Sequence, residues 1–293
     1  MRDGRVVSAL QKLPYPITYG GRMLPASYIS GACTDEGYRR RGLMGELLDQ
    51  THRAMQKEGA LLGFLIPATE ELATYYAKFG YTPCFRFGWE TVAAQPLTQE
   101  IEVVQAAEPP LEYIRTRMQE RPMCVQHPLA DLRAVVDDMR LAGDALWEAR
   151  RGTLVVAAGI CRAEADGVLL RECVYDDEAA RDALIAGIAV HYGRTEIDVI
   201  QLSATEGNYF GMARVIDVEG MLAAYAALHP EADCVIRVTD PLLTENDGCY
   251  RLAGGQCERL QAPVSVAQQY TIAALTDLLV AQENLLMTLM MND

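Results

Sequence analysis

An arginine- and glycine-rich segment is the part of the sequence whose residue types most clearly indicate chemistry. It reads Tyr38-Arg39-Arg40-Arg41-Gly42-Leu43-Met44-Gly45 and stands between an apolar stretch and a stretch with helical spacing. The first N–H groups of a helix have no partners inside the helix and carry the positive end of its dipole. Glycine lets a phosphate approach that backbone, and arginine adds forked donors and positive charge. The segment therefore predicts a cradle for a diphosphate group.

Two well-known phosphate-binding patterns are absent from the sequence. No Gly-Lys-Ser/Thr occurs, as in the loop that binds ATP, and no Gly-x-Gly-x-x-Gly occurs, as in dinucleotide-binding proteins. The diphosphate is therefore not expected to belong to ATP or NAD. The alternative is a solvated basic turn, and the spacing alone leaves both interpretations open.

Hydrophobic patterning predicts the elements that position this segment. The expected order is a strand at 27–33, a loop at 34–41, a helix at 42–58, a strand at 61–66, a helix at 69–78 and a strand at 81–92. Thr69 is expected to cap the second helix, and Gly80 to follow its end. Strand, basic loop and helix thus alternate as a phosphate cradle requires.

Later parts of the chain repeat the alternation of sheet and helix without a basic glycine loop. Gln95-Pro96 and the Glu108-Pro109-Pro110 cluster mark a boundary region. Beyond it the sequence predicts strands at 145–149, 154–160, 168–175 and 197–202, a helix at 177–192, then strands at 234–239 and 250–252 and one or two helices from 271 to the end. The run Leu275–Met291 is expected to be an amphipathic helix, not a membrane span.

The charge balance limits the classes of partner. The 293 residues carry a formal net charge of −14, yet residues 1–60 carry a local +3. An acidic protein is a poor binder of nucleic acid or of an anionic membrane surface, whereas a cationic partner fits. The basic beginning coincides with the three adjacent arginines.

Cysteine and histidine usage points away from metal sites and disulfides. The eight cysteines are scattered singly, and none stands at metal-ligand spacing with one of the four histidines. His52 is expected to be a surface or hydrogen-bonded residue rather than a catalytic one. Without a signal-peptide pattern or a long apolar stretch, we expect a cytoplasmic protein that binds no metal and does not enter the membrane.

Several motifs resemble the GNAT N-acetyltransferase superfamily, and within it the enhanced intracellular survival (Eis) proteins. Arg39-x-x-Gly42-x-Met44 resembles the acyl-CoA loop, with methionine where a small residue is usual. Tyr75–Tyr81 resembles the corner in which a short helix ends in Phe-Gly-Tyr. Met212–Asp217 resembles the exit from a middle domain, and Arg237–Pro241 with Glu245–Gly248 resembles the start of a sterol-carrier-like domain.

The resemblance implies a mixed α/β fold of the α+β class with tandem GNAT-like domains. Residues 1–95 would form the acetyltransferase domain, 96–230 a second GNAT-like domain without a CoA loop, and 231–293 a short sterol-carrier-like domain. Only 28 residues precede Ile29, so the first strand and two helices of the acetyltransferase domain are expected to be missing. By analogy with the family, which tends to assemble into hexamers, the chain would form a homo-oligomer.

The resemblance also implies an activity and its residues. It is the transfer of acetyl from acetyl-CoA to a primary amine by direct attack in a ternary complex. Cys33 and Thr34 would hold the pantetheine and polarise the thioester, and the backbone of Arg39, Arg40, Arg41, Gly42, Leu43 and Met44 would bind the diphosphate. Tyr76 matches the family's general acid, with Tyr75 as a close competitor.

Two readings of function follow from the resemblance. The acceptor would be a small cationic amine, such as an aminoglycoside or polyamine, or a lysine side chain. The chain ends in Met-Met-Asn-Asp, whereas relatives end in an aromatic residue whose carboxylate serves as base, so no base is assigned. The alternative is a catalytically impaired CoA-binding or assembly protein with the same fold.

Overall fold

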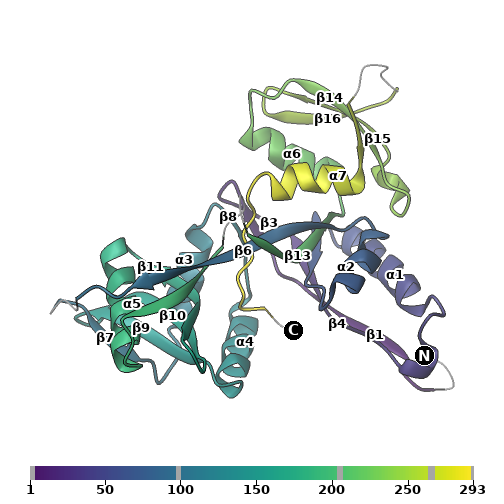
Figure 1. The fold of residues 1–293 in the computed structure, drawn as a ribbon. Coiled ribbons are helices and arrows are strands. Elements are labelled where there is room, and N and C mark those ends of the chain that lie inside the picture. The colour runs from purple at the N-terminus through teal and green to yellow at the C-terminus, as the bar shows by residue number, and fades with distance from the viewer. Residues whose placement is uncertain (1–3, 97–99, 203–206, 263–267, 292–293) are drawn as a thin grey trace. The chain divides into compact units, whose positions relative to one another are not determined.

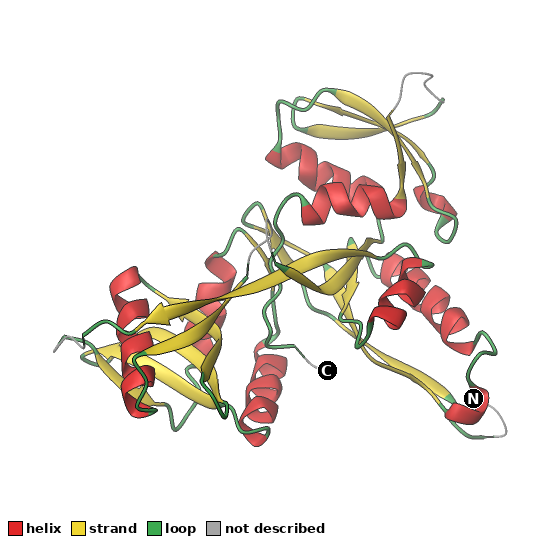
Figure 2. Ribbon diagram, in the orientation of Figure 1, coloured by secondary structure: helices red, strands yellow, loops and turns green. Residues whose placement is uncertain are grey.

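The computed structural model describes residues 4–96, 100–202, 207–262 and 268–291. Backbone contacts divide the chain into two units. Figure 1 colours the chain by residue number, and Figure 2 colours it by secondary structure. The first unit contains residues 1–86 and 209–285, and the second contains residues 87–208 and 286–292. Each unit is described by itself.

The first sheet of unit 1 holds the segments that the sequence predicts around the arginine loop. Its strands, in spatial order, are β1 (Ser8–Leu13), β4 (Ala26–Thr34), β5 (Leu62–Leu65), β13 (Asn208–Val215) and the beginning of β6 (Thr82–Ala93). β4 is antiparallel to β1 and parallel to β5, and β13 is antiparallel to β5. A short hairpin, β2 (Ile17–Tyr19) and β3 (Arg22–Leu24), joins β1 to β4. β13 was not predicted, and it comes from more than a hundred residues farther along the chain.

Two helices of unit 1 confirm the predicted pattern. α1 (Leu43–Lys57) follows the arginine loop, and α2 (Glu70–Ala77) follows β5. Thr69 caps α2, because its side chain accepts a hydrogen bond from the N–H of Leu72. Both helices pack on the sheet through one core of apolar residues: Ile29, Leu48, Met55, Leu65, Tyr76, Tyr81, Met212 and Ile216.

The C-terminal part of unit 1 is a separate four-stranded sheet with helices. The order of its strands is β16 (Gln256–Leu260), β15 (Gly248–Ala253), β14 (Cys234–Thr239) and β17 (Gln268–Thr271). β14 and β17 are parallel, and the other pairs are antiparallel. α6 (Val218–Leu228) precedes this sheet and α7 (Ile272–Thr276) follows it.

The helix predicted over Leu275–Met291 is wrong beyond its first residues. α7 continues only as a π-helical segment, Asp277–Ala281. Asn284 then adopts a left-handed backbone with φ of 60°, which ends helical geometry. Most of the remaining apolar residues are buried without a helix, and Met290 joins a core of unit 2. Leu286, which is half-buried, forms a β-bridge with Cys124.

Unit 2 contains a mixed sheet with helices. The strands of this sheet, in spatial order, are the last part of β6, then β12 (Glu196–Gln201), β11 (Val168–Tyr175), β10 (Leu154–Ala163), β9 (Ala145–Arg151) and β7 (Glu102–Gln105). A short strand, β8 (Met123–Val125), and three helices, α3 (Leu111–Glu120), α4 (Leu129–Leu141) and α5 (Glu178–His191), complete the unit. β11 and β12 are parallel and joined by α5. These elements confirm the mixed α/β class, although β7, β8, α3 and α4 were not predicted.

No helix in the described ranges has the length and apolar content needed to traverse a lipid bilayer. The predicted domain limits at 95 and 230 stay predictions. Each compact unit combines segments that are distant in the sequence, so the units do not correspond one to one to the predicted domains.

Candidate active site

The arginine loop is a turn held by its own side chains. Asp35 begins it by accepting a hydrogen bond from the N–H of Gly37 at 3.0 Å. Arg39 Nε donates to the carbonyl of Thr34 at 3.2 Å, and Arg41 Nη2 donates to the carbonyl of Gly37 at 2.8 Å. Within the described ranges, none of the three adjacent arginines is paired with a carboxylate. Among the described residues, the three guanidinium groups therefore have no carboxylate counter-ion.

The N-terminus of α1 lies at the end of this loop without a side-chain cap. Gly42 stands at the cap position with φ of 80°, a conformation that glycine adopts without strain. The first backbone bond of the helix is from the N–H of Glu46 to the carbonyl of Gly42 at 3.0 Å. The N–H groups of Leu43, Met44 and Gly45 precede that bond, so they are available to an anion at the positive end of the helix.

Arg40 adds strain at the same place. Its φ is 62°, in the left-handed region that side chains other than glycine and asparagine rarely enter. Strained backbone of this kind is concentrated at ligand-binding loops. Arg40 is exposed, and none of its side-chain nitrogens bonds to another residue of the described ranges.

One edge of β4 is open beside the loop. Its pairing with β5 runs from Ala26–Leu62 to Ile29–Leu65, and β5 then ends. β4 continues five residues farther, where Cys33 and Thr34 are paired only with β1 on the opposite edge. Among the described residues, no strand covers the edge that faced β5. An extended ligand can therefore hydrogen-bond to β4 as an added strand would.

The aromatic corner, Tyr75–Tyr81, begins in the last turn of α2. Tyr76 is only 7% exposed, and its ring lies edge-on to Tyr75 at 5.6 Å and to Tyr81 at 6.0 Å between centroids. Burial, and then the neighbouring Tyr75, raises the pKa of the Tyr76 phenol above its ordinary value. Burial also raises the pKa of Tyr75. Both phenols are therefore protonated at neutral pH, as a general acid must be.

The structure brings the arginine loop and the aromatic corner together. A methyl group placed on Gly45 would lie 3.2 Å from Cζ of Phe79 and 3.7 Å from Oη of Tyr75. Met44 packs on the core that contains Tyr76. The first turn of α1 is thus in contact with the residues that end α2. The predicted cradle and the aromatic corner are therefore neighbours in the structure, and their functional roles stay predictions.

A buried polar network behind the corner was not predicted from the sequence. Of the two alternatives predicted for His52, the hydrogen-bonded one is confirmed: the side chain is fully buried, and its Nε2 lies 3.0 Å from the Tyr81 hydroxyl. Burial, and then the nearby Arg214, lowers the pKa of His52 to about 3. Arg214 and Asp240 form an ion pair at 2.6 Å, and both side chains are 0% exposed. The available signal was a single arginine within the apolar run of β13, which requires a buried partner.

In the described ranges, no three His, Cys, Asp or Glu side chains gather closely enough to hold a metal ion. The site therefore offers backbone N–H groups, arginines and phenols. These groups can bind an anionic ligand and transfer a proton.

Comparisons with known proteins identify two domains. Residues 1–84 match the acetyltransferase (GNAT) domain family, and residues 218–286 match the sterol carrier protein domain family. No curated protein matches the chain. The arginine loop and the aromatic corner both lie within the first match.

Solved structures share the fold at low sequence identity. Eis1 from Mycobacterium abscessus is 16% identical with a TM-score of 0.75, over 96% of this chain and 78% of that one. A GCN5-related N-acetyltransferase from Anabaena variabilis is 18% identical with a TM-score of 0.75, over 94% and 78%. Another from Kribbella flavida is 19% identical with a TM-score of 0.71, over 93% and 75%. The chain therefore carries a GNAT acetyltransferase domain and a sterol carrier protein domain, and its fold is Eis-like.

Proposed function

We propose that the protein transfers an acetyl group from acetyl-CoA to a primary amine by direct attack in a ternary complex. The observation that carries this proposal is the contact between the uncapped N-terminus of α1 and the corner that contains Tyr76. Such a transfer needs a site for the diphosphate and, at the other end of the pantetheine arm, a protonated phenol within reach of the thioester sulfur.

The residues present fit acetyl-CoA as co-substrate. The N–H groups of Leu43, Met44 and Gly45, with the charge of the adjacent arginines, would bind the diphosphate. The open edge of β4 at Cys33 and Thr34 would hold the extended pantetheine and donate to the thioester carbonyl. Both features lie on consecutive segments of the chain, as one extended ligand requires.

The proposed chemistry needs no covalent enzyme intermediate. A neutral amine attacks the thioester carbonyl carbon, a C–N bond forms and the C–S bond breaks. Tyr76 gives its phenolic proton to the departing thiolate and recovers one from solvent. The excess proton of the attacking nitrogen leaves to solvent, and we assign no residue as base.

The acceptor is proposed to be cationic when free. A net charge of −14 attracts polyamines, aminoglycosides and lysine side chains, whereas the three arginines serve the anionic co-substrate. Because the two substrates carry opposite charges, the acceptor would be kept out of the acetyl-CoA site and acetyl-CoA out of the acceptor site.

The test combines turnover and binding. Acetyl-CoA is mixed with a panel of amines and free thiol is followed, while calorimetry measures CoA binding. Turnover above background with any amine supports the proposal. CoA binding without turnover favours the alternative, a CoA-binding or assembly protein. If the protein neither binds CoA nor shows turnover, the proposed activity and the alternative are both overturned.

A further inference from the structure

A buried ion pair connects the aromatic corner to the C-terminal part of unit 1. Arg214, on β13, donates from Nη1 to the carbonyl of Phe79 at 2.6 Å and from Nη2 to Oδ2 of Asp240 at 2.6 Å. Phe79 lies three residues after Tyr76, and its N–H donates to the Tyr76 carbonyl at 2.9 Å. The backbone turn that follows the phenol is thus bound by a charged donor.

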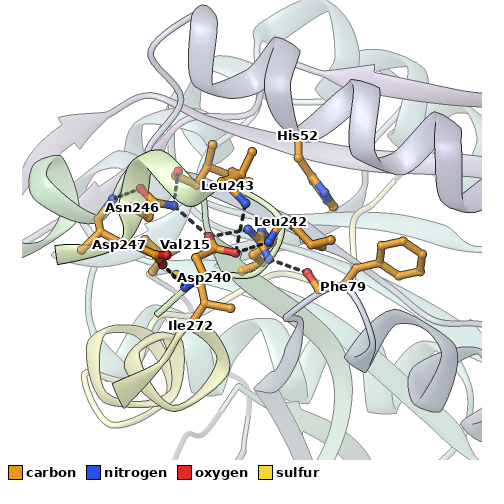
Figure 3. A network of polar contacts seen from close by, with 12 residues as sticks. His52, Phe79, Val215, Asp240, Leu242, Leu243, Asn246, Asp247 and Ile272 are labelled. Atoms are coloured by element: carbon orange, nitrogen blue, oxygen red, sulfur yellow. Dashed lines mark hydrogen bonds and ion pairs between the residues drawn. The ribbon is translucent and has the colours of Figure 1, made fainter. Parts of the chain in front are cut away.

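Asp240 is itself fixed on several sides, as Figure 3 shows. Its Oδ1 accepts from the N–H groups of Leu242 at 3.1 Å and Leu243 at 3.2 Å, and its Oδ2 accepts from Asn246 Nδ2 at 2.9 Å. All these donors lie in the connection between β14 and β15. The carboxylate cannot rotate without losing them, so the C-terminal sheet determines where the guanidinium of Arg214 lies.

The packing leaves this guanidinium no room to move toward the corner. A methyl group on Gly80 would lie 2.4 Å from Nη1 of Arg214. Hydrogen bonds from a charged donor are short and strong, and a phenol that transfers a proton must be held within a fraction of an ångström. A displacement at the Phe79 carbonyl would therefore reach Tyr76 through a single helical turn.

Stability alone is a weak account of this pair. A buried ion pair generally stabilises a fold no more than apolar residues of similar volume, because both charges lose their hydration. What apolar residues could not supply is the donor to the Phe79 carbonyl.

We propose that Arg214 and Asp240 are positioning residues for Tyr76, acting through the Phe79 carbonyl. The sterol-carrier-like part of the chain is then the support of the acetyltransferase site. This inference rests on the proposed function and on Tyr76 as the acid.

The first experiment separates positioning from stability. The double variant Arg214→Met/Asp240→Leu removes both charges together, so it avoids an uncompensated buried charge. We expect it to fold, as judged by circular dichroism, with kcat reduced about tenfold and the KM for acetyl-CoA nearly unchanged, because the phenol is misplaced while the co-substrate site is intact. Arg214→Lys keeps one donor and should recover part of the loss. A folded double variant with the kcat of the wild type would overturn the proposal.

A control variant tests for general effects of losing a buried charge. Asp144 in unit 2 has a 0% exposed carboxylate that binds Arg162 and Arg171. Asp144→Asn is expected to leave kcat unchanged within about twofold, since this residue touches nothing in the corner. An equal fall in kcat for Asp144→Asn and the double variant would overturn the positioning role.

A second readout does not depend on turnover. With 3-fluorotyrosine at position 76, the fluorine resonance reports the surroundings of the phenol. It should shift or broaden in the double variant and in Arg214→Lys, but not in Asp144→Asn. An unchanged resonance in Arg214→Lys and the double variant overturns the inference. If the wild type turns over no amine, the proposed function fails, while this resonance still decides whether the ion pair positions Tyr76.

Discussion

Two adjacent phenols on α2 differ in their surroundings, and this difference gives a test of the acid. Tyr76 is buried between two aromatic rings, whereas Tyr75 is partly exposed with its hydroxyl near Gly45. Among the described residues, neither hydroxyl has a hydrogen-bond partner in the structure. The sequence leaves the two as competitors. Burial favours Tyr76 as the acid, because a buried phenol keeps its proton until a base such as the departing thiolate forms beside it.

Replacing each phenol by phenylalanine separates them. Tyr76→Phe is expected to lower kcat about 100-fold with little change in KM, because a general acid acts mainly in the transition state. Tyr75→Phe is the matched control and should lower kcat less than about threefold. Because the pKa of Tyr76 is raised, wild-type kcat should not fall on the alkaline side until the pH exceeds the ordinary tyrosine value of about 10. The reverse ranking of the two variants would assign the acid to Tyr75.

Arg40 provides the sharpest test of the diphosphate cradle. Arg39 and Arg41 also hold the turn through backbone carbonyls, whereas Arg40 makes no such bond to any residue that the structure describes. Arg40→Ala should therefore weaken CoA binding about tenfold and reduce its salt dependence without loosening the loop. Calorimetry at two salt concentrations measures both. Arg22→Ala, an exposed arginine on β3, is the control, and equal affinities of wild type and Arg40→Ala would remove the cradle.

At the scale of elements, the end of α2 depends on a glycine for two reasons. Gly80 has φ of 82°, and a methyl group there would lie 2.4 Å from Arg214 Nη1 and 2.6 Å from Cγ2 of Ile272. Gly59, at the end of α1, has φ of 81°, and a methyl group placed on it would have no described atom of another residue within 4 Å. The two helices thus end in the same backbone conformation with different packing.

Alanine at the two glycines should separate backbone strain from overpacking. Gly59→Ala is expected to lower the free energy of unfolding by about 1 kcal/mol, the cost of left-handed backbone for alanine. Gly80→Ala should lower it by about 3 kcal/mol or more, because Arg214 or Ile272 must also move. Denaturant unfolding followed by circular dichroism measures both. Equal losses would mean that the corner tolerates displacement of Arg214.

Elements with strong local signals could be predicted from the sequence, and those that depend on distant partners could not. Thr69 caps the helix expected of it, the helix predicted at 177–192 forms as α5, and 168–175 forms the expected strand. By contrast, the apolar run before Asn284 gives no local sign that its helix ends there. The arginine loop was found because its chemistry is local, whereas Arg214 and Asp240 acquire their role only when β13 lies beside β5.

At the scale of the whole molecule, the return of the chain into unit 1 is what the sequence could not reveal. β13 pairs with β5, a strand about 150 residues earlier, and the sterol-carrier-like part then follows within the same unit. The hydrophobic pattern of a strand does not identify the distant strand with which it pairs. The site accordingly combines a locally encoded loop and corner with a support that only the folded unit assembles.

Two histidines of unit 1 should make its stability depend on pH in opposite directions. Burial, and then Arg214, lowers the pKa of His52 to about 3, so the folded state keeps it neutral while the unfolded chain takes up a proton below about 6.5. Its effect therefore reduces stability as the pH falls below 6.5. Burial opposes protonation of His229, but the hydrogen bond and charge of Glu283 and then Glu231 outweigh it and raise its pKa. Protonated His229 therefore adds stability at low pH, which is lost as the pH rises through its folded pKa.

Unfolding of the wild type, His52→Gln and His229→Gln across this pH range tests the opposition. From pH 6.5 to 5, the stability of His52→Gln should gain about 2 kcal/mol relative to the wild type, because glutamine takes up no proton. His229→Gln should instead lose stability relative to the wild type as the pH falls through the same range. Denaturant titrations followed by circular dichroism give the free energies. Parallel pH profiles for all three proteins would mean that neither imidazole differs in pKa between the folded and unfolded states.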